Sequence, residues 1–104
     1  MISAILLAAG ESKRMGQPKQ LLTWQGKTFL EHILESLMSS DADEIILVLG
    51  HEAGRIRSSL PALPITIAIN PDYRQGMASS LRRGILAMDP RSEAFLLCLA
   101  DQPG

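Results

Sequence analysis

The chain has 104 residues, 46% of them hydrophobic, and a formal net charge of −1 at pH 7. This length predicts a single domain, residues 1–104, with enough apolar side chains for a core and too many for a disordered chain. The near-neutral charge excludes a general nucleic-acid binder, so any basic site must be local. One cysteine, Cys98, excludes a disulfide framework and a cysteine-rich metal site, and its apolar surroundings predict a buried thiol.

The sequence gives no sign of export or of membrane insertion. The N-terminus lacks the basic region, the apolar stretch and the cleavage site of a signal peptide. No apolar run is long enough to span a bilayer. We therefore expect a cytoplasmic protein without a membrane partner.

The first element is an apolar run, residues 2–8, which predicts a buried strand. Small residues and Gly10 follow, and they let the backbone turn sharply and approach a ligand closely. A strand that opens into a basic, glycine-containing loop is typical of phosphate binding. The spacing fits neither common glycine motif, because five residues separate Gly10 from Gly16 and G-x-G-x-x-G is absent. The cations of this loop are Lys13, Arg14 and Lys19.

The second element opens with a capping box. The spacing of Thr28 and Glu31 lets the threonine hydroxyl accept a hydrogen bond from a first-turn amide while the glutamate reaches back. Apolar residues then recur at helical spacing, which predicts an amphipathic helix with one face toward the core. These residues are Phe29, Leu30, Ile33, Leu34, Leu37 and Met38.

Two strands and a short helix come next. Residues 44–49 are apolar and β-branched and predict a second strand, and residues 65–69 predict a third. Between them, residues 53–60 predict a short helix that has few apolar residues and lies loosely on the surface. His51 follows the second strand, where ligands tend to bind in α/β sheets, but we interpret it as an ordinary loop histidine.

A second polar loop covers residues 70–77. Asn70-Pro71 favours a turn, and Gly76 allows tight backbone geometry. The helix after this loop is expected to start at Ala78 or Ser79. Residues 95–99 predict a fourth strand. The side chains of the last helix that we expect to face the core are Leu81, Ile85, Leu86 and Met88.

The alternation of strands and helices predicts an α/β fold with a parallel sheet that is covered on both faces. Right-handed crossovers place the carboxyl ends of all parallel strands at one edge. Residues 9–19, Gly50-His51, residues 70–77 and Asp101 should therefore converge there, at the edge where open α/β sheets bind ligands. This convergence predicts the functional site.

The groups expected at that edge suit a nucleoside triphosphate with a metal ion. Arg14 can grip phosphate oxygens with two hydrogen bonds, and Lys19 acts as a point charge. Residues 70–80 supply an amide and hydroxyls for a base and a ribose. Asp101 supplies a carboxylate, which suits Mg²⁺. The predicted chemistry is nucleotidyl transfer, in which metal and cations neutralise charge at the α-phosphate while pyrophosphate leaves.

The string from Leu7 to Lys19 resembles the nucleotide-binding loop of the MobA-like NTP transferases, and the resemblance continues over essentially the whole chain. It implies a Rossmann-like, three-layer (GT-A-like) nucleotidyltransferase fold, with its strands in the order third, second, first, fourth. It implies catalytic roles for Arg14, Lys19 and Asp101, with Asp101 holding Mg²⁺. The implied nucleotide-binding residues are Leu7, Ala8, Ala9, Gly10, Ser12, Arg14, Gly16, Lys19, Asn70, Gly76, Met77, Ser79 and Ser80.

Ala8-Ala9-Gly10 resembles the CTP-using branch of the family, which transfers CMP to molybdopterin. The resemblance implies that CTP binds better than GTP, and that molybdopterin and a xanthine-dehydrogenase-type molybdoenzyme are partners. Family members are longer, so the chain is expected to be the N-terminal, nucleotide-binding part of a truncated domain. Two alternatives stay open: a shortened, non-catalytic nucleotide-binding module and a sugar-phosphate nucleotidyltransferase.

Overall fold

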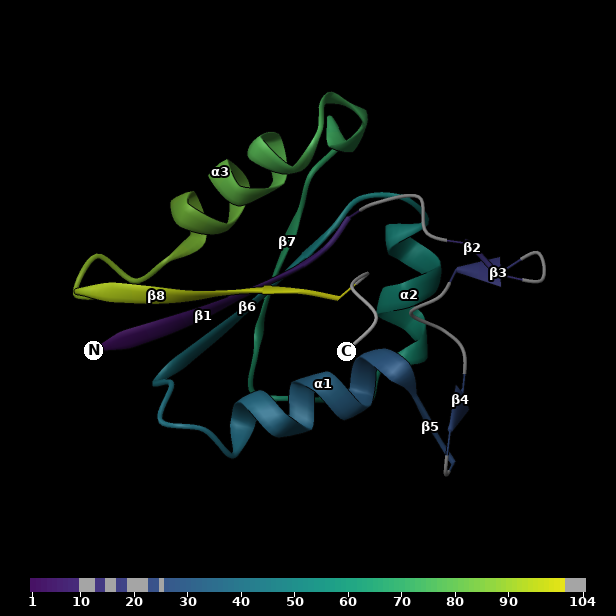
Figure 1. The fold of residues 1–104 in the computed structure, drawn as a ribbon, viewed down its shortest axis with the longest axis horizontal. Helices are drawn as coiled ribbons and strands as arrows, with labels where there is room; N and C mark the ends of the chain where they lie inside the picture. Colours follow the sequence, from purple (N-terminus) through teal and green to yellow (C-terminus); the bar gives the residue numbers. More distant parts are fainter. Residues whose placement is uncertain (10–12, 15–16, 19–22, 25, 101–104) are drawn as a thin grey trace.

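The computed structural model describes residues 1–9, 13–14, 17–18, 23–24 and 26–100 (Figure 1). Its main sheet has four parallel strands in the order β7-β6-β1-β8, which confirms the predicted order of third, second, first and fourth. The predicted α/β fold is also confirmed. The strands are β1 (Ile2–Ala8), β6 (Glu44–Leu49), β7 (Thr66–Ile69) and β8 (Ala94–Leu99).

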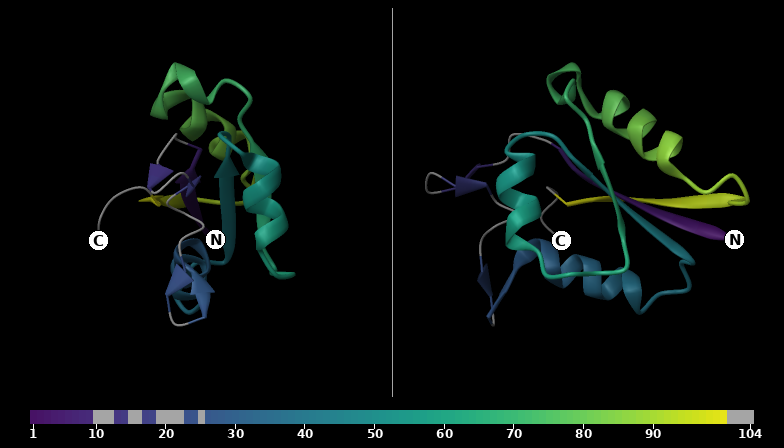
Figure 2. Two further views of the ribbon diagram at one scale, coloured as in Figure 1. Left: turned by 90° about the vertical axis from the view of Figure 1, so that its right-hand side faces the viewer. Right: turned by 180° about the vertical axis from the view of Figure 1, so that it is seen from behind.

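Helices cover both faces of this sheet and give it three layers (Figure 2). One face carries α1 (Phe29–Met38) and α2 (Ala53–Ser59), and the other carries α3 (Met77–Ala87). A short 3-10 turn, η2 (Tyr73–Gln75), leads into α3. No helix within the described residues is long and apolar enough to span a bilayer.

The predicted capping box of α1 is confirmed. The Glu31 amide donates to Thr28 Oγ1 at 3.1 Å, and the Glu31 carboxylate accepts from the Thr28 amide at 3.4 Å. The helix then buries Leu30, Leu34 and Leu37 against one face of the sheet. Burying a leucine side chain contributes about 1.5–3 kcal/mol, so this stripe anchors the helix.

The second helix is better anchored than the sequence indicated. We expected residues 53–60 to lie loosely on the surface because they contain few apolar residues. Ile56 of α2, however, is only 1% exposed and joins the same core cluster as the leucines of α1. Ala53 and Leu60, at the two ends of this helix, also pack against that cluster, so α2 is attached to the core along its length.

Two expectations for α3 were wrong. The helix begins at Met77, one residue before the earliest predicted start. Ile85 and Leu86 were expected to face the core but are 41% and 74% exposed, whereas Ser80 and Gly84 are buried. Small residues face the sheet because the helix backbone lies close to it. The other two predicted side chains, Leu81 and Met88, do pack against the sheet.

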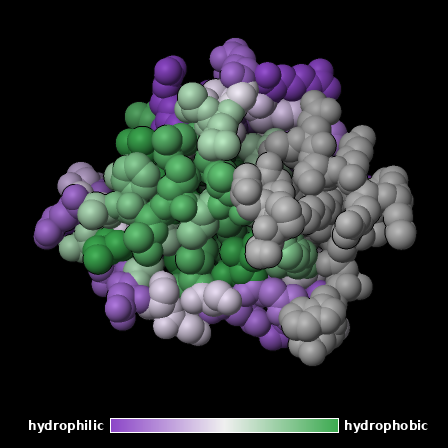
Figure 3. All heavy atoms as spheres, in the orientation of Figure 1, coloured by the Kyte–Doolittle hydropathy of each residue, from purple (hydrophilic) through white to green (hydrophobic). Residues whose placement is uncertain are grey.

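The β8 strand also departs from the prediction of a sheet covered on both faces. Phe95, Leu96 and Leu97 are 38–51% exposed, and Cys98 is half-buried rather than buried. Among the described residues β8 pairs with β1 alone, so it forms an edge of the sheet. Hydrophobic atoms gather across the left and centre of Figure 3, where β8 lies toward the viewer.

Two short antiparallel pairs precede α1, and we did not predict them. In the first, β2 (Lys13–Arg14) pairs with β3 (Gln17–Pro18). In the second, β4 (Thr23–Trp24) pairs with β5 (Lys27–Thr28). Gly26 lies in a turn directly before β5, and its φ of +82° is one that glycine adopts without strain.

Candidate functional site

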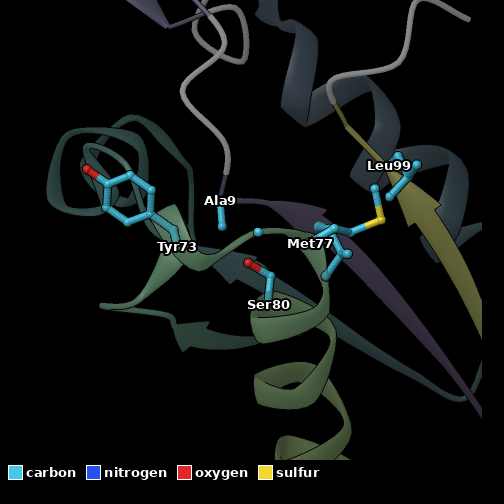
Figure 4. Close-up of a pocket in the computed structure, with 7 residues that line it drawn as sticks. Ala9, Tyr73, Met77, Ser80 and Leu99 are labelled. Atoms are coloured by element: carbon cyan, nitrogen blue, oxygen red, sulfur yellow. The ribbon is translucent and has the colours of Figure 1, made fainter.

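A pocket with a cavity volume of about 160 Å³ lies at the carboxyl edge of the sheet (Figure 4). It opens between the ends of β1 and β8 and the start of α3. Loops that are far apart in the sequence therefore meet at the edge where the alternation of elements predicted a site. The residues that line the pocket are Leu7, Ala9, Tyr73, Gly76, Met77, Ser80 and Leu99.

Five of these seven residues were predicted to bind a nucleotide, and the structure brings them together. Tyr73 and Leu99 were not predicted. Leu99 ends the strand next to β1, so its place at the carboxyl edge follows from the topology. Tyr73 lies inside the polar loop of residues 70–77, and an aromatic residue in a loop that converges on a site was the available signal.

Asn70 stands behind the pocket and is fully buried. Its Nδ2 donates to Ser79 Oγ and to Ser80 Oγ, both at 2.9 Å, and its Oδ1 accepts from the Asp72 amide at 3.0 Å. Both amide hydrogens are therefore used within the protein. Asn70 thus fixes the loop against α3 and shapes the pocket from behind.

The two serines at the start of α3 have different surroundings. Ser79 Oγ lies 2.7 Å from the Gly76 carbonyl oxygen and 3.1 Å from the Asp72 carbonyl oxygen, so its one hydroxyl hydrogen donates to the backbone at the first turn of the helix. Ser80 lines the pocket and is 4% exposed. Its oxygen accepts from Asn70, and among the described residues its hydroxyl hydrogen has no acceptor. Ser80 can therefore donate a hydrogen bond into the pocket.

Gly76 caps the amino end of α3 with a φ of +106°, a conformation that favours glycine. Gly76 and Met77 line the pocket, so the amino end of α3 lies at it, and a helix N-terminus carries partial positive charge. In Figure 4, the Met77 side chain extends over the pocket toward Leu99, so the wall on that side is apolar. The pocket therefore combines apolar walls with a few donors.

Of the remaining predicted site residues, the structure describes some and not others. Ala8 is buried and ends β1. Arg14 belongs to β2, where its backbone pairs with Gln17. Among the described residues, no cluster of three metal-ligating side chains occurs. The predicted residues that lie outside the described ones are Gly10, Ser12, Gly16, Lys19 and Asp101.

The chain is similar to several characterised proteins. A family model for the MobA-like NTP transferase domain matches residues 4–104. Nicotine blue oxidoreductase of Paenarthrobacter nicotinovorans is 36% identical over 104 residues, which are 99% of this chain and 50% of that protein. Molybdenum cofactor cytidylyltransferase of Escherichia coli (strain K12) is 34% identical over 103 residues, 98% of this chain and 52% of that protein.

A solved structure shares the fold. The complex of Rv0371C from Mycobacterium tuberculosis H37Rv with manganese superposes with a TM-score of 0.82 at 31% identity, and covers 98% of this chain and 51% of that one. The chain thus spans about half the length of the relatives it matches.

Proposed function

Because the chain belongs to the family of MobA-like NTP transferase domains, we propose that it binds CTP as the nucleotide-binding part of an enzyme that transfers CMP to molybdopterin. The observation that carries this proposal is the pocket at the carboxyl end of β1, directly before the basic loop of residues 10–19. In a parallel α/β sheet this edge binds ligands. The CMP-transferring activity named for one relative supports the choice of reaction.

The described side chains suit the base and ribose of a nucleotide. The cavity of about 160 Å³ accepts part of a nucleotide rather than all of it. Leu7, Met77 and Leu99 offer apolar contact to a base, and Ser80 offers a hydrogen-bond donor. A few donors among apolar walls are typical of small-molecule sites, where they fix the orientation of the ligand.

The triphosphate would extend from this pocket over the loop that follows Ala9. In this role, the amides of residues 9–16 cradle phosphate oxygens, while Arg14 and Lys19 neutralise charge. Positive groups fixed at the α-phosphate lower the barrier to transfer because negative charge builds up there as pyrophosphate leaves. Arg14 and Lys19 are therefore the proposed catalytic cations.

Asp101 is the proposed ligand of Mg²⁺. It directly follows Ala100, whose amide donates to Leu7 O at 3.0 Å beside the pocket, so the backbone that leads to the carboxylate is anchored at the site. Carboxylate oxygen is a ligand type that Mg²⁺ prefers, and the manganese complex of a relative supports a divalent cation. When bound, the ion would supply charge neutralisation at the phosphates.

The proposal also specifies which nucleotide binds and which molecule accepts the CMP group. Ala8-Ala9-Gly10 supports CTP over GTP, and molybdopterin with a xanthine-dehydrogenase-type enzyme completes the proposed partners. Other relatives are named as an oxidoreductase and as the bifunctional protein GlmU, so the acceptor is tested separately from the nucleotide. Nucleotide binding is therefore the property to measure first.

Calorimetric titration with CTP and with GTP, each with and without Mg²⁺, tests the proposal. We expect CTP with Mg²⁺ to bind tightest. Asp101→Asn should lose the gain that Mg²⁺ brings and keep metal-free binding, whereas Arg14→Lys should weaken binding in both conditions because the two-pronged contact is lost. Arg57→Lys, on the exposed side of α2, is the matched control.

Two results would contradict the proposal in different ways. A clear GTP preference would overturn the choice of nucleotide but leave the site intact. Absence of binding by either triphosphate, with normal melting curves, would overturn the site itself.

A further inference from the structure

Residues 50 and 51 connect two walls of the pocket. The His51 amide donates to Ala9 O at 3.1 Å, and Ala9 forms the wall at the end of β1. The His51 side chain reaches the other wall, where its Nδ1 lies 3.3 Å from the Tyr73 hydroxyl. The two rings meet edge to face, with centroids 5.7 Å apart and planes at 63°. One residue thus contacts both sides of the pocket.

Gly50 brings these walls close together. A Cβ atom on Gly50 would lie 2.6 Å from Tyr73 Cβ, closer than real Cβ atoms come to a neighbour, and 3.0 Å from Ala9 Cβ, which is tighter than an ordinary contact. Only a residue without a side chain fits between them. The tyrosine therefore packs directly on the backbone at the end of β6.

The position of Tyr73 sets the position of the start of α3. Tyr73 begins the η2 turn, and its carbonyl accepts from the Gly76 amide at 3.2 Å. Gly76 in turn caps α3 and lines the pocket together with Met77. A displacement of the tyrosine would therefore carry the adjoining wall with it.

The Tyr73 hydroxyl is turned away from the pocket. Figure 4 shows its oxygen on the far side of the ring from Ala9, Ser80 and Met77. The hydroxyl is thus directed away from a ligand in the pocket, and His51 Nδ1 is its hydrogen-bond partner. His51 Nε2 is buried and has no partner among the described residues, so Nδ1 is the nitrogen that acts on the tyrosine.

We propose that His51 is a positioning residue which, through Tyr73, holds the wall of the nucleotide pocket in its binding position. The proposal rests on the nucleotide binding proposed above. It assigns a role to a residue that the sequence presented as an ordinary loop histidine. His51 acts by restricting η2 and the start of α3, without contact to the nucleotide itself.

The test compares CTP affinity, with Mg²⁺ present, in His51→Phe, Tyr73→Phe and the double variant. Both single variants keep an aromatic ring and lose the hydrogen bond. Each should raise the Kd about three- to tenfold, the effect of one neutral hydrogen bond. The double variant should bind about as well as either single one, because both changes remove the same contact.

Two rescue variants identify the nitrogen. His51→Asn places an amide near the position of Nδ1 and should restore most of the affinity. His51→Gln places its amide nearer to Nε2 and should not. His32→Phe removes the other histidine, in α1, and should leave the Kd unchanged, which separates this contact from a general effect of losing an imidazole.

A spectroscopic readout follows the contact without any nucleotide. Tyr73 is the sole tyrosine of the chain, so a protein labelled with ¹³Cζ-tyrosine gives one NMR signal. This signal should move in His51→Phe and return toward its original position in His51→Asn. An unmoved signal would overturn the hydrogen bond and the proposal with it.

The affinity data separate two kinds of failure. If the unmodified chain binds CTP and both phenylalanine variants bind it equally well, the positioning role is refuted while the nucleotide site stands. If the unmodified chain binds no triphosphate, the nucleotide site is refuted and the role of His51 falls with it.

Discussion

The two faces of the sheet are covered in opposite ways. On one face, α1 presents leucines, and these large side chains fill the space between helix and strands. On the other face, α3 presents Ser80 and Gly84, so its backbone lies close to the strands. The first arrangement buries more large apolar side chains. The second brings a helix N-terminus and a serine hydroxyl to the strand ends, where the pocket lies.

The difference indicates a division of labour between the helices. The α1 face stabilises the fold. The α3 face buries fewer apolar side chains, and the backbone of α3 lies closer to the strands. Leu86 of α3 is 74% exposed, although a leucine in that helix would stabilise the protein more if it were buried. Substitutions on the two faces should therefore differ in size and in sign.

The largest effect is expected on the α1 face. Leu34 is fully buried, and Leu34→Ala should lower the free energy of unfolding by about 2–5 kcal/mol because it removes apolar contacts and leaves a cavity. Urea unfolding followed by circular dichroism measures it. The matched control, Leu86→Ala on α3, should change stability by less than about 0.5 kcal/mol. Similar losses at both positions would contradict the comparison.

A pair of glycines tests the close approach of α3. A Cβ on Gly84 would lie 2.6 Å from Ile5 Cγ2, whereas a Cβ on Gly54 in α2 would meet no atom within 4 Å. Gly84→Ala should therefore destabilise the protein by about 1 kcal/mol, since overpacking costs about 1–3 kcal/mol and helix propensity returns part of it. Gly54→Ala should stabilise it by about 0.5–1 kcal/mol. Stability changes of the same sign would refute the close packing.

These two helices also show what the sequence could predict. In α1, apolar residues at helical spacing behind a capping box indicated both the helix and its buried face, because large side chains drive that packing. In α3, the same rule placed Ile85 and Leu86 inside, and the structure places them outside. Periodicity of apolar residues cannot identify a face that packs through small ones.

The strand order and the site edge followed from the alternation of elements and the family resemblance, because chain connectivity determines where parallel strands end. Individual contacts did not follow. The Asn70 amide hydrogens are donated to two serines at the start of α3, a contact that the sequence did not predict. The contact of His51 with Tyr73 joins residues 22 positions apart, and no local pattern encodes it.

A third prediction concerns how the two helices begin. Thr28 caps α1 with its side chain, whereas Gly76 caps α3 without one. Thr28→Ala should cost about 1 kcal/mol of stability and leave CTP affinity unchanged, because α1 lies away from the pocket lining. Chemical denaturation and CTP titration of the same variant check both parts. Loss of affinity without loss of stability would contradict the separation of the two faces.

The smallest effect is expected at the far end of α3, in the turn that contains Asp89. The Arg91 side chain donates to the Asp89 carboxylate at 2.9 and 3.0 Å, and the Arg91 amide donates at 2.8 Å. These hydrogen bonds lower the pKa of Asp89 to about 2. A lowered pKa means that the folded state favours the charged carboxylate, so the stabilisation is full above the unfolded pKa of about 3.9.

This stabilisation should fade as the pH falls through about 2, where Asp89 becomes protonated in the folded protein as well. Asp89→Asn removes the titrating group, so the stability difference between the two proteins should be constant above about pH 5 and shrink between about pH 4 and pH 2. Because Arg91 is 80% exposed, salt should screen the pair and reduce the difference further. Unfolding curves across this pH range, at low and high salt, measure it. A difference that does not change with pH would mean that the pair acts only as neutral hydrogen bonds of the turn.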